Sequence, residues 1–371
     1  MSHKLHFSLN PLLNVRLRKL TAIVIVWMFI GLLLSVYDHL VLITYSQGGI
    51  HESYSFRTAL TFHLASSFMG AMLGGWFLIF VIDKRFKSQP YIRSILAVCI
   101  VFVAIFSVII LITSCMHALF ENDFNFYDPK TKQRILELIL TPIHLNHIMF
   151  WATVVALTQI TLQVNDKFGQ GLFWSMIAGK YHLPKAEERI FMFLDLKSST
   201  SIAERLGNKK YHGLLKDVFS DITDPILSTR GEIYQYIGDE VVISWTMEKG
   251  VKHSHCIACY FGIKKVLDSF RTKYISKYDV LPEFKAGLHY GMVIAGEIGV
   301  IKRDITYSGD VLNTTARIQG KCNDFEQALI VSEELMKRIN QIEAYNYDKL
   351  GDIKLKGKEQ KVSLYGVEEI S

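Results

Sequence analysis

Residues 191–200 read FMFLDLKSST, and this stretch contains a candidate functional residue. Four apolar residues in succession are typical of a strand that is buried on both faces. The run ends on Asp195, so the strand would place a carboxylate at the edge of its sheet. The alternative is that Asp195 simply lies beside the N-terminus of a following helix, for which Ser198 or Ser199 is a plausible N-cap.

The chain on either side of this stretch mixes strand and helix patterns without strict alternation. The expected helices cover residues 199–206, 214–227, 255–274 and 308–319. The expected strands cover residues 190–194, 231–237, 241–245, 284–290, 292–296, 353–356 and 362–367. Because strands and helices do not alternate regularly, the pattern favours an α+β domain over a doubly wound sheet.

A second carboxylate lies in the segment GEIYQYIGDEVV, residues 231–242, where Gly238 and Asp239 form the turn of a predicted hairpin. Neighbouring strands lie about 4.8 Å apart, so carboxylates at the ends of adjacent strands can share a cation. Two aspartates with open positions suit Mg²⁺, which keeps several waters and accepts phosphate oxygens of a substrate. The alternative reading of Asp239 is an ordinary type I′ turn residue.

The first 165 residues have a different character from the rest of the chain. The whole chain is 50% hydrophobic with a mean hydropathy of +0.22, and long apolar runs concentrate in this part. A helix that spans a bilayer needs about 20 apolar residues. Four segments qualify, which predicts a four-helix transmembrane bundle: residues 20–45, 60–82, 95–114 and 138–162.

Basic residues predict how this bundle is oriented. They gather before the first span and between the second and third, at Arg16, Arg18, Lys19, Lys84, Arg85, Lys87 and Arg93. The positive-inside rule then predicts a multi-pass protein of the inner (cell) membrane with the N-terminus and the globular part in the cytoplasm. The net charge of +6 includes no dense basic tract, so no nucleic-acid partner is expected.

Histidines recur at similar depth in all four predicted spans. They lie toward the outer end of the bundle, at His39, His63, His117, His144 and His147, and Asp38 is next to the first of them. Ionisable residues inside a membrane are functional candidates. The alternatives are hydrogen bonds between helices or interfacial placement, a haem b or other metal site built from facing helices, and a quinone or proton-sensing site.

Several segments occur in a characteristic order after FLDLKSST. They are GEIYQYIGDEVV, then AGLHYGMVIAGEIGVIKRDITYSGDVLNTTARI at residues 286–318, then IKLKG at residues 353–357. Together they closely resemble the class III nucleotidyl cyclase catalytic domain, over about residues 187–367. The arrangement of a short membrane bundle before this domain resembles bacterial membrane-bound adenylate cyclases. The resemblance implies an α+β fold with a ferredoxin-like βαββαβ core.

The predicted organisation has four parts. They are a cytoplasmic N-terminus (residues 1–19), the four-helix transmembrane domain (20–163), a signal-transducing linker (164–186) and the nucleotide cyclase catalytic domain (187–371).

The resemblance also implies roles for individual residues. Asp195 and Asp239 match the two metal-binding aspartates, with the backbone carbonyl of Leu196 as a further ligand, for two Mg²⁺ (or Mn²⁺) ions per active site. Asn313 and Arg317 match the pair that acts on the transition state, by orienting the ribose and by neutralising charge on the α-phosphate. A further residue, Lys356, would contact the triphosphate; otherwise it is a solvated hairpin lysine.

The implied reaction converts ATP to 3′,5′-cyclic AMP and pyrophosphate by in-line attack of the ribose 3′-oxygen. In this family one catalytic domain supplies the metal aspartates and a second supplies the Asn and Arg. A chain that carries both halves once should therefore be a homodimer with two equivalent sites. Movement of the membrane helices would then regulate both sites by changing how the two copies meet.

The match is weakest at the residues that select the base. Gln235 stands where the family usually has a lysine that reads adenine, whereas Thr306 is a familiar choice at its position. A Gln amide both donates and accepts hydrogen bonds, so it could read adenine or guanine. ATP is the favoured substrate, and a guanylate or mixed-specificity cyclase is the alternative. A catalytically silent nucleotide-binding receptor is disfavoured because all four metal and Asn/Arg positions are retained.

Overall fold

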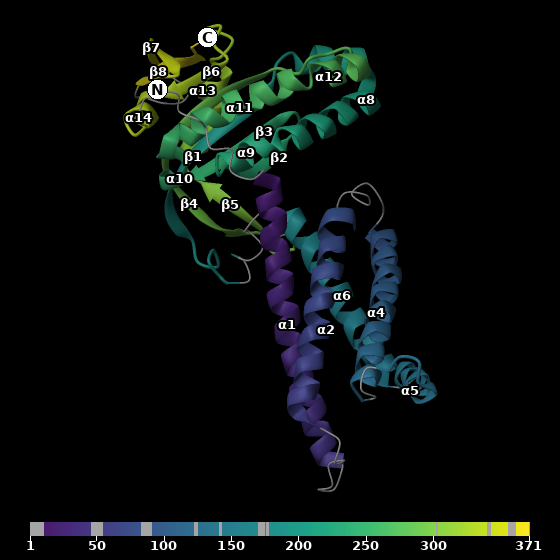
Figure 1. The fold of residues 1–371 in the computed structure, drawn as a ribbon. Helices are drawn as coiled ribbons and strands as arrows, with labels where there is room; N and C mark the ends of the chain where they lie inside the picture. The colour runs from purple at the N-terminus through teal and green to yellow at the C-terminus, as the bar shows by residue number, and fades with distance from the viewer. Residues whose placement is uncertain are drawn as a thin grey trace. The chain divides into compact units, whose positions relative to one another are not determined.

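The computed structural model describes residues 11–45, 55–82, 91–121, 125–140, 143–169, 175, 178–301, 303–339, 343–354 and 361–370. The chain divides into two compact units, Met1–Val164 and Asn165–Ser371 (Figure 1). The first unit is helical and the second combines a large sheet with helices.

Four long helices dominate the first unit. They are α1 (Pro11–Tyr45), α2 (Phe56–Trp76) continued by the π-helix η1 (Phe77–Ile82), α4 (Tyr91–Glu121) and α6 (Ile143–Phe168). All four are long and apolar enough to cross a membrane, which confirms the predicted spans. The first helix begins nine residues before the predicted start at Leu20, because Arg and Lys end an apolar run without ending a helix.

A separate short helix corrects the expected start of the fourth span. The prediction began that span at Leu138, but α5 (Pro129–Ile139) is a helix of its own. Asp128 caps it by accepting a hydrogen bond from the Lys130 backbone N–H at 2.9 Å. The sequence has Pro142 between α5 and α6, and the residue before a proline is disfavoured in helical geometry.

Small residues form the contact between α1 and α2. Ser67, Ala71 and Gly75 follow one another at intervals of four on α2, and all three are buried. A Cβ atom added at Gly31 of α1 would lie 2.0 Å from the Ser67 Oγ. A helix pair in a membrane gains its packing energy from such close approach of backbones. The two helices are therefore locked in one register at this point.

Hydrogen bonds tie the remaining helices of the first unit together. The Trp27 Nε1–H of α1 donates to the Thr158 Oγ1 of α6 at 3.1 Å. The Gln159 Nε2 of α6 donates to the Ser94 Oγ of α4 at 3.1 Å. Each bond joins polar groups that would otherwise lie unsatisfied among apolar side chains.

The second unit contains an eight-stranded sheet with strand order β2-β3-β1-β4-β6-β8-β7, in which β5 pairs with β4. Among the strand pairs that the structure describes, the β4–β6 pair alone is parallel. The strands are β1 (Lys185–Leu196), β2 (Glu232–Ile237), β3 (Glu240–Thr246), β4 (Phe284–Ile298), β5 (Asp304–Ser308), β6 (Leu329–Ser332), β7 (Tyr345–Lys354) and β8 (Lys361–Glu369). This mixed sheet confirms the α+β prediction.

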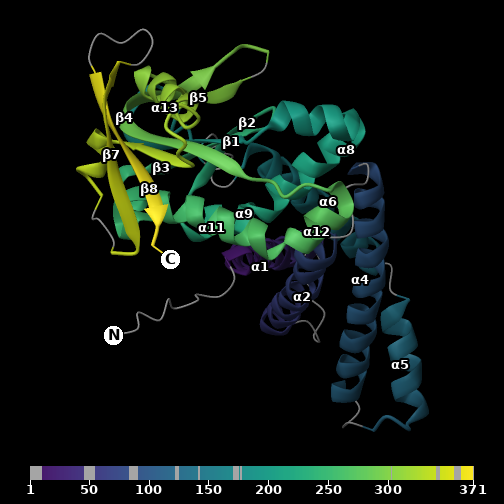
Figure 2. The ribbon, with the colours of Figure 1, turned by 90° about the horizontal axis from the view of Figure 1, so that it is seen from above.

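Helices cover the sheet unequally. Those of the second unit are α8 (Ser199–Asp221), α9 (Thr223–Ser228), α10 (Met247–Val251), the 3₁₀ turn η2 (Lys252–Ser254), α11 (His255–Ser269), α12 (Arg271–Tyr278), α13 (Asp310–Gly320) and α14 (Glu333–Met336). Figure 2 shows α9, α11 and α12 on one side of the sheet and α13 on the other. Alternate residues of β1 face the two sides, so its apolar run is buried on both faces as predicted.

Strand β4 differs from the prediction. Residues 284–290 and 292–296 were expected to form two strands, but β4 is a single strand of 15 residues. A Cβ atom at Gly291 would lie 2.8 Å from the Val311 Cγ2, and one at Gly287 would lie 2.4 Å from the Gln319 backbone nitrogen. These glycines therefore let α13 approach the strand closely, and they do not form a turn.

Helix boundaries in the second unit also differ from those predicted from the sequence. The predicted helix 255–274 is broken at Phe270 into α11 and α12. The predicted helices 199–206 and 214–227 are replaced by α8 and α9, and α8 contains Gly207 at a φ of 70°. Ser198 occupies the N-cap position of α8, but its side chain makes no capping hydrogen bond.

Candidate active site

Asp195 lies at the end of β1, in the middle of the sheet. It is paired with Glu240 of β3 on one side and with Lys285 of β4 on the other. The Lys285 Nζ is 3.2 Å from the Asp195 Oδ2. The Gln319 Nε2 of α13 donates a hydrogen bond of 3.0 Å to the same oxygen. Asp195 is thus held in place by groups from a strand and a helix on different parts of the chain.

Asp239 follows Gly238 in the turn between β2 and β3. Gly238 has a φ of 64°, a conformation that glycine adopts without strain. The Asp239 Oδ2 is buried, yet it accepts no hydrogen bond from the described residues. A buried carboxylate oxygen without a partner is costly, so its natural partner is a group that binds from outside the chain.

Electrostatic effects show that the acidic side chains lie close together. Burial raises the pKa of the Asp195 carboxyl, the Lys285 ammonium opposes this shift, and Asp239 adds to it. Burial raises the pKa of Glu240 to about 7, and Asp195 and Asp239 contribute further. Burial together with Asp239 likewise raises the pKa of the Tyr211 hydroxyl. The strand ends therefore carry concentrated negative charge.

This donor set fits a hard cation. The ligands that Mg²⁺ and Mn²⁺ prefer are oxygens, and the strand ends offer carboxylate, hydroxyl and backbone oxygens. Leu196, the predicted backbone ligand, has a side chain that is 1% exposed and packs in the core. Only its backbone remains to face the acidic cluster. Glu240 and Tyr211 were not predicted from the sequence, although the Asp-Glu pair at the hairpin turn was a signal for the first.

Asn313 and Arg317 both belong to α13, the helix that also carries Gln319. The buried face of α13 consists of Val311, Thr314, Thr315, Ile318 and Gln319. Asn313 is exposed and Arg317 is half-buried. Residues four apart share a helix face, and this pair falls on the face opposite the packed one. Within one chain, therefore, the pair points away from the sheet that carries Asp195.

The two residues expected to read the base come from segments that touch. Gln235 is exposed on β2, and Thr306 lies on β5 with a buried Oγ1 that makes no hydrogen bond to the described residues. Their neighbours Tyr234 and Tyr307 have ring centroids 5.0 Å apart. β2 and β5 are not adjacent in the sheet, and this aromatic contact connects them together with a hydrogen bond of 3.4 Å from the Tyr307 backbone N–H to the Tyr234 hydroxyl.

A buried arginine that was not predicted lies beneath these segments. Arg189 is 2% exposed. Its guanidinium donates to Glu187 at 3.0 Å and to Glu232 at 2.9 Å, and it stacks over the Tyr307 ring at 4.6 Å. A buried charge needs such full pairing. Arg189 thereby links β1, β2 and β5. The sequence analysis did not single it out, because no local pattern reveals partners that are 43 or 118 residues away.

Lys356, the predicted triphosphate contact, lies outside the described residues.

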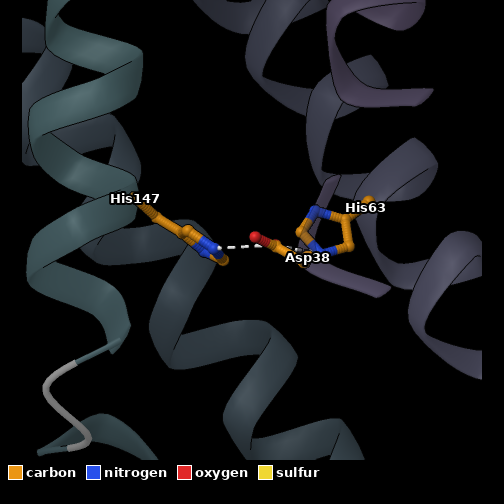
Figure 3. Close-up of side chains that lie close together, drawn as sticks. All are labelled: Asp38, His63 and His147. Carbon is orange, nitrogen blue, oxygen red and sulfur yellow. Dashed lines mark ion pairs between the residues drawn. The ribbon is translucent and has the colours of Figure 1, made fainter. Parts of the chain in front are cut away.

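The membrane histidines are not equivalent in the structure. His63 of α2 and His147 of α6 meet at Asp38 of α1 (Figure 3). His39 instead lies against the Phe56 ring, with centroids 4.5 Å apart, and His117 against Phe62, at 5.6 Å. The His144 side chain lies outside the described part of the structure. Of the four predicted histidines whose side chains the structure describes, it brings two together, and an aspartate lies between them.

Residues 183–369 match a protein family described as the adenylate and guanylate cyclase catalytic domain. The chain is 36% identical to "Adenylate cyclase 2" of Rhizobium meliloti (strain 1021), covering 55% of this chain and 56% of that protein. It is 26% identical to "Adenylate cyclase" of Anabaena cylindrica, covering 56% of this chain and 43% of that one. The chain thus spans about half the length of the curated relatives that it matches.

Among solved structures, the fold resembles that of a bacterial light-regulated adenylyl cyclase. The TM-score is 0.52 at 24% identity, covering 60% of this chain and 65% of the other. At this level of identity the likeness concerns the fold alone.

Proposed function

This chain belongs to the adenylate and guanylate cyclase catalytic domain family over residues 183–369, and on that premise we propose that it is a membrane-bound adenylate cyclase. It would convert ATP to 3′,5′-cyclic AMP and pyrophosphate. The observation that best supports this proposal is the buried, unpartnered Oδ2 of Asp239 beside Asp195, because an active cyclase needs two carboxylates with capacity left for cations.

Asp195 and Asp239, with the backbone carbonyl of Leu196, would hold two Mg²⁺ or Mn²⁺ ions. Such ions, when bound, activate the ribose 3′-hydroxyl and stabilise negative charge on the departing pyrophosphate. Lys285 already neutralises part of the charge on Asp195 in their absence. Gln319 holds the same carboxylate in position. These two side chains therefore fix the position of the Asp195 carboxylate.

Asn313 would orient the ribose by hydrogen bonding, and Arg317 would neutralise charge that develops on the α-phosphate. Both lie on the outer face of α13, directed away from the sheet of their own chain. We therefore propose a homodimer in which each α13 serves the site of the other copy. Two equivalent sites follow from the two-fold symmetry of such a pair. Lys356 would contact the triphosphate as a point charge.

Base selection would fall to Gln235 and Thr306. We propose ATP as the substrate, and relatives that are named adenylate cyclases support this choice. The amide of Gln235 offers both a donor and an acceptor, so a guanylate or mixed-specificity activity is the second candidate. A silent nucleotide receptor is a weaker candidate, because Asp195, Asp239 and the α13 pair are all present.

The proposed arrangement assigns the four parts of the chain as follows. The N-terminus (residues 1–19) and the catalytic domain (187–371) lie in the cytoplasm, the bundle (20–163) crosses the inner membrane, and the linker (164–186) carries conformational changes between them. Arg16, Arg18 and Lys19 at the start of α1 support this orientation.

A complementation experiment tests both the reaction and the shared site. Asp195→Ala and Arg317→Ala should each lower ATP cyclisation by at least about 100-fold, since each removes a group that acts on the transition state. Random mixing of the two variants makes half of the dimers heterodimers, each with one intact site. The mixture should therefore recover roughly a quarter of the wild-type rate.

Two differently tagged copies let the heterodimers be isolated before the assay. Isolated heterodimers without activity would show that the site is not shared between copies. Variants that keep wild-type activity would show that these residues are not catalytic. Parallel assays with GTP decide the substrate.

A further inference from the structure

The cluster of Asp38, His63 and His147 lies in the first unit, apart from the residues of the candidate active site. We propose that these three side chains form a binding site for one divalent transition-metal cation of the Zn²⁺ type. The proposal does not depend on cyclase activity, because it rests on the geometry of the bundle alone.

The three side chains come from three different helices and converge on one point. The His63 Nε2 lies 3.4 Å from the Asp38 Oδ2, and the His147 Nε2 lies 3.5 Å from the same oxygen. All three donor atoms lie within 4.8 Å of one another. Figure 3 shows the Asp38 carboxylate between the two imidazoles.

The distances fit a shared cation better than direct hydrogen bonds. A hydrogen bond from a protonated imidazole to a carboxylate is about 2.7–2.9 Å long, and the Asp38 Oδ2 accepts no hydrogen bond from the described residues although this atom is buried. Ligands about 2.0–2.1 Å from a tetrahedral Zn²⁺ lie about 3.3–3.4 Å from each other. The two nitrogen–oxygen distances are close to that edge length.

The type of ligand indicates the type of cation. Imidazole nitrogens favour Zn²⁺ and other first-row transition metals, whereas Mg²⁺ and Ca²⁺ favour oxygen donors alone. Two histidines and one carboxylate leave at least one coordination position open. A haem fits less well, because the Asp38 oxygen lies between the two imidazoles where a porphyrin plane would have to pass.

A cavity next to the cluster can supply the remaining ligand. It has a volume of about 220 Å³. His63 and His147 line it together with the polar side chains Ser66, Thr113 and His117. A water molecule takes up about 30 Å³, so the cavity has room for several waters. Residues of α2, α4, α5 and α6 line the cavity, and α1 contributes Asp38 to the cluster beside it.

The surrounding packing holds the ligands in position. Ser67 donates to the His63 backbone carbonyl at 2.7 Å and contacts Gly31 of α1, seven residues before Asp38. The Trp27–Thr158 hydrogen bond ties α1 to α6. A metal site binds tightly only when its ligands are oriented before the ion arrives, and this scaffold provides that orientation.

The position along the helices indicates the side of access. Asp38 lies six residues before Thr44 and His63 seven residues after Phe56, which places both about 10 Å from the same end of the bundle. The basic residues Arg16, Arg18 and Lys19 lie at the opposite end of α1. If the basic end is cytoplasmic, the site opens toward the outside of the membrane.

The test uses full-length protein without a polyhistidine tag, in nanodiscs with millimolar Mg²⁺ to occupy the catalytic aspartates. Co²⁺ is the spectroscopic probe and Zn²⁺ the competitor. Wild-type protein should bind one Co²⁺ per chain with visible d–d bands, and Zn²⁺ should displace it. Asp38→Asn, His63→Gln and His147→Gln should each weaken binding by at least about 10–100-fold. His39→Gln is the matched control and should bind as the wild type does.

Two results would overturn the proposal. One is wild-type protein without stoichiometric Co²⁺ or d–d bands, which would leave the cluster as a set of ion pairs. The other is equal binding by the wild type and all three ligand variants, which would place the metal elsewhere. Size-exclusion profiles identify any variant that misfolds. If the variants misfold, the spectrum of the wild-type protein alone shows whether Co²⁺ is coordinated.

Discussion

At the scale of single residues, the candidate active site is defined by groups that lack partners within the chain. The Lys285 ammonium neutralises part of the charge on Asp195. The buried Oδ2 of Asp239, by contrast, has no partner among the described residues. The chain thus tolerates concentrated negative charge at the point where its strands end. Such an arrangement costs stability unless a cation is bound.

Cation binding should therefore stabilise the folded protein. At a Mg²⁺ or Mn²⁺ concentration 100-fold above the dissociation constant, the free energy of unfolding should rise by about 2.7 kcal/mol per site. Asp239→Asn should abolish this gain, and it should raise stability in EDTA because it removes the unpaired buried charge. Thermal unfolding with and without metal measures both effects.

Asp268→Asn is the matched control for that measurement. Asp268 is exposed and pairs with Arg271, so its variant should keep the full response to metal. An equal response in Asp239→Asn would show that the cation binds elsewhere.

Gln235 offers a second prediction at this scale. A lysine donates only, whereas the Gln amide can both donate and accept, so Gln235→Lys should narrow the range of bases that the site accepts. We expect the ratio of kcat/KM for ATP to that for GTP to rise about 10-fold, which corresponds to about 1.4 kcal/mol of differential binding. Initial rates with both nucleotides measure this ratio. An unchanged ratio would mean that Gln235 does not contact the base.

At the scale of elements, the α1–α2 contact depends on small side chains at intervals of four. Ala71 is fully buried in this contact. Ala71→Leu should therefore force the helices apart and destabilise the bundle by about 1–3 kcal/mol, as overpacking does elsewhere. It should also weaken Co²⁺ binding, because Asp38 and His63 lie on the separated helices.

Met72→Leu is the control for that variant. Met72 is the next residue on α2 but is exposed, so its substitution should change neither thermal stability in nanodiscs nor Co²⁺ affinity. Wild-type stability in Ala71→Leu would show that α1 and α2 do not pack through this face.

Helix α11 supports a prediction about thiol reactivity. Burial raises the pKa of Cys256, Cys259 and Cys322 to about 12. The first two lie on α11, and Cys322 follows α13. Because only the thiolate reacts, a rise from 9 to about 12 lowers its fraction at pH 8 by about 1,000-fold. These three thiols should resist maleimide at pH 8 until denaturant is added. Peptide mapping by mass spectrometry identifies which cysteines are labelled, and rapid native labelling of Cys256 would contradict the described burial.

The sequence predicted elements well where a single local pattern decides them. The four spans follow from hydropathy, and β1 follows from its apolar run, so both were found. Strand β4 was split wrongly because Gly291 reads as a turn unless the approach of α13 is known. The same limit applies to sites. Asp195 and Asp239 were found from their places at predicted strand ends and then matched family motifs, whereas Arg189 and Gln319 acquire their partners only through tertiary contacts.

At the scale of the whole molecule, the proposed shared site makes activity a property of two copies. Nanodiscs that contain one chain should be nearly inactive, and nanodiscs that contain two should account for the cyclase activity. The reason is that Asn313 and Arg317 point away from the sheet of their own chain. Nanodiscs sorted by copy number, assayed at equal chain concentration, measure the difference. Equal activity per chain in both populations would contradict the dimer.

In such a dimer, the hydrogen bond between Gln319 and Asp195 would link the two active sites. Asp195 would belong to one site, while Gln319 lies two residues after Arg317 on the helix that serves the other site. A cation that binds Asp195 would compete with Gln319 for the same carboxylate oxygen. Loss of the Gln319 hydrogen bond would weaken the contact between α13 and β1. Binding of a cation and ATP at one site would therefore change the affinity of the other site for them. The two sites would respond to ATP cooperatively, with no additional regulatory domain required for that behaviour.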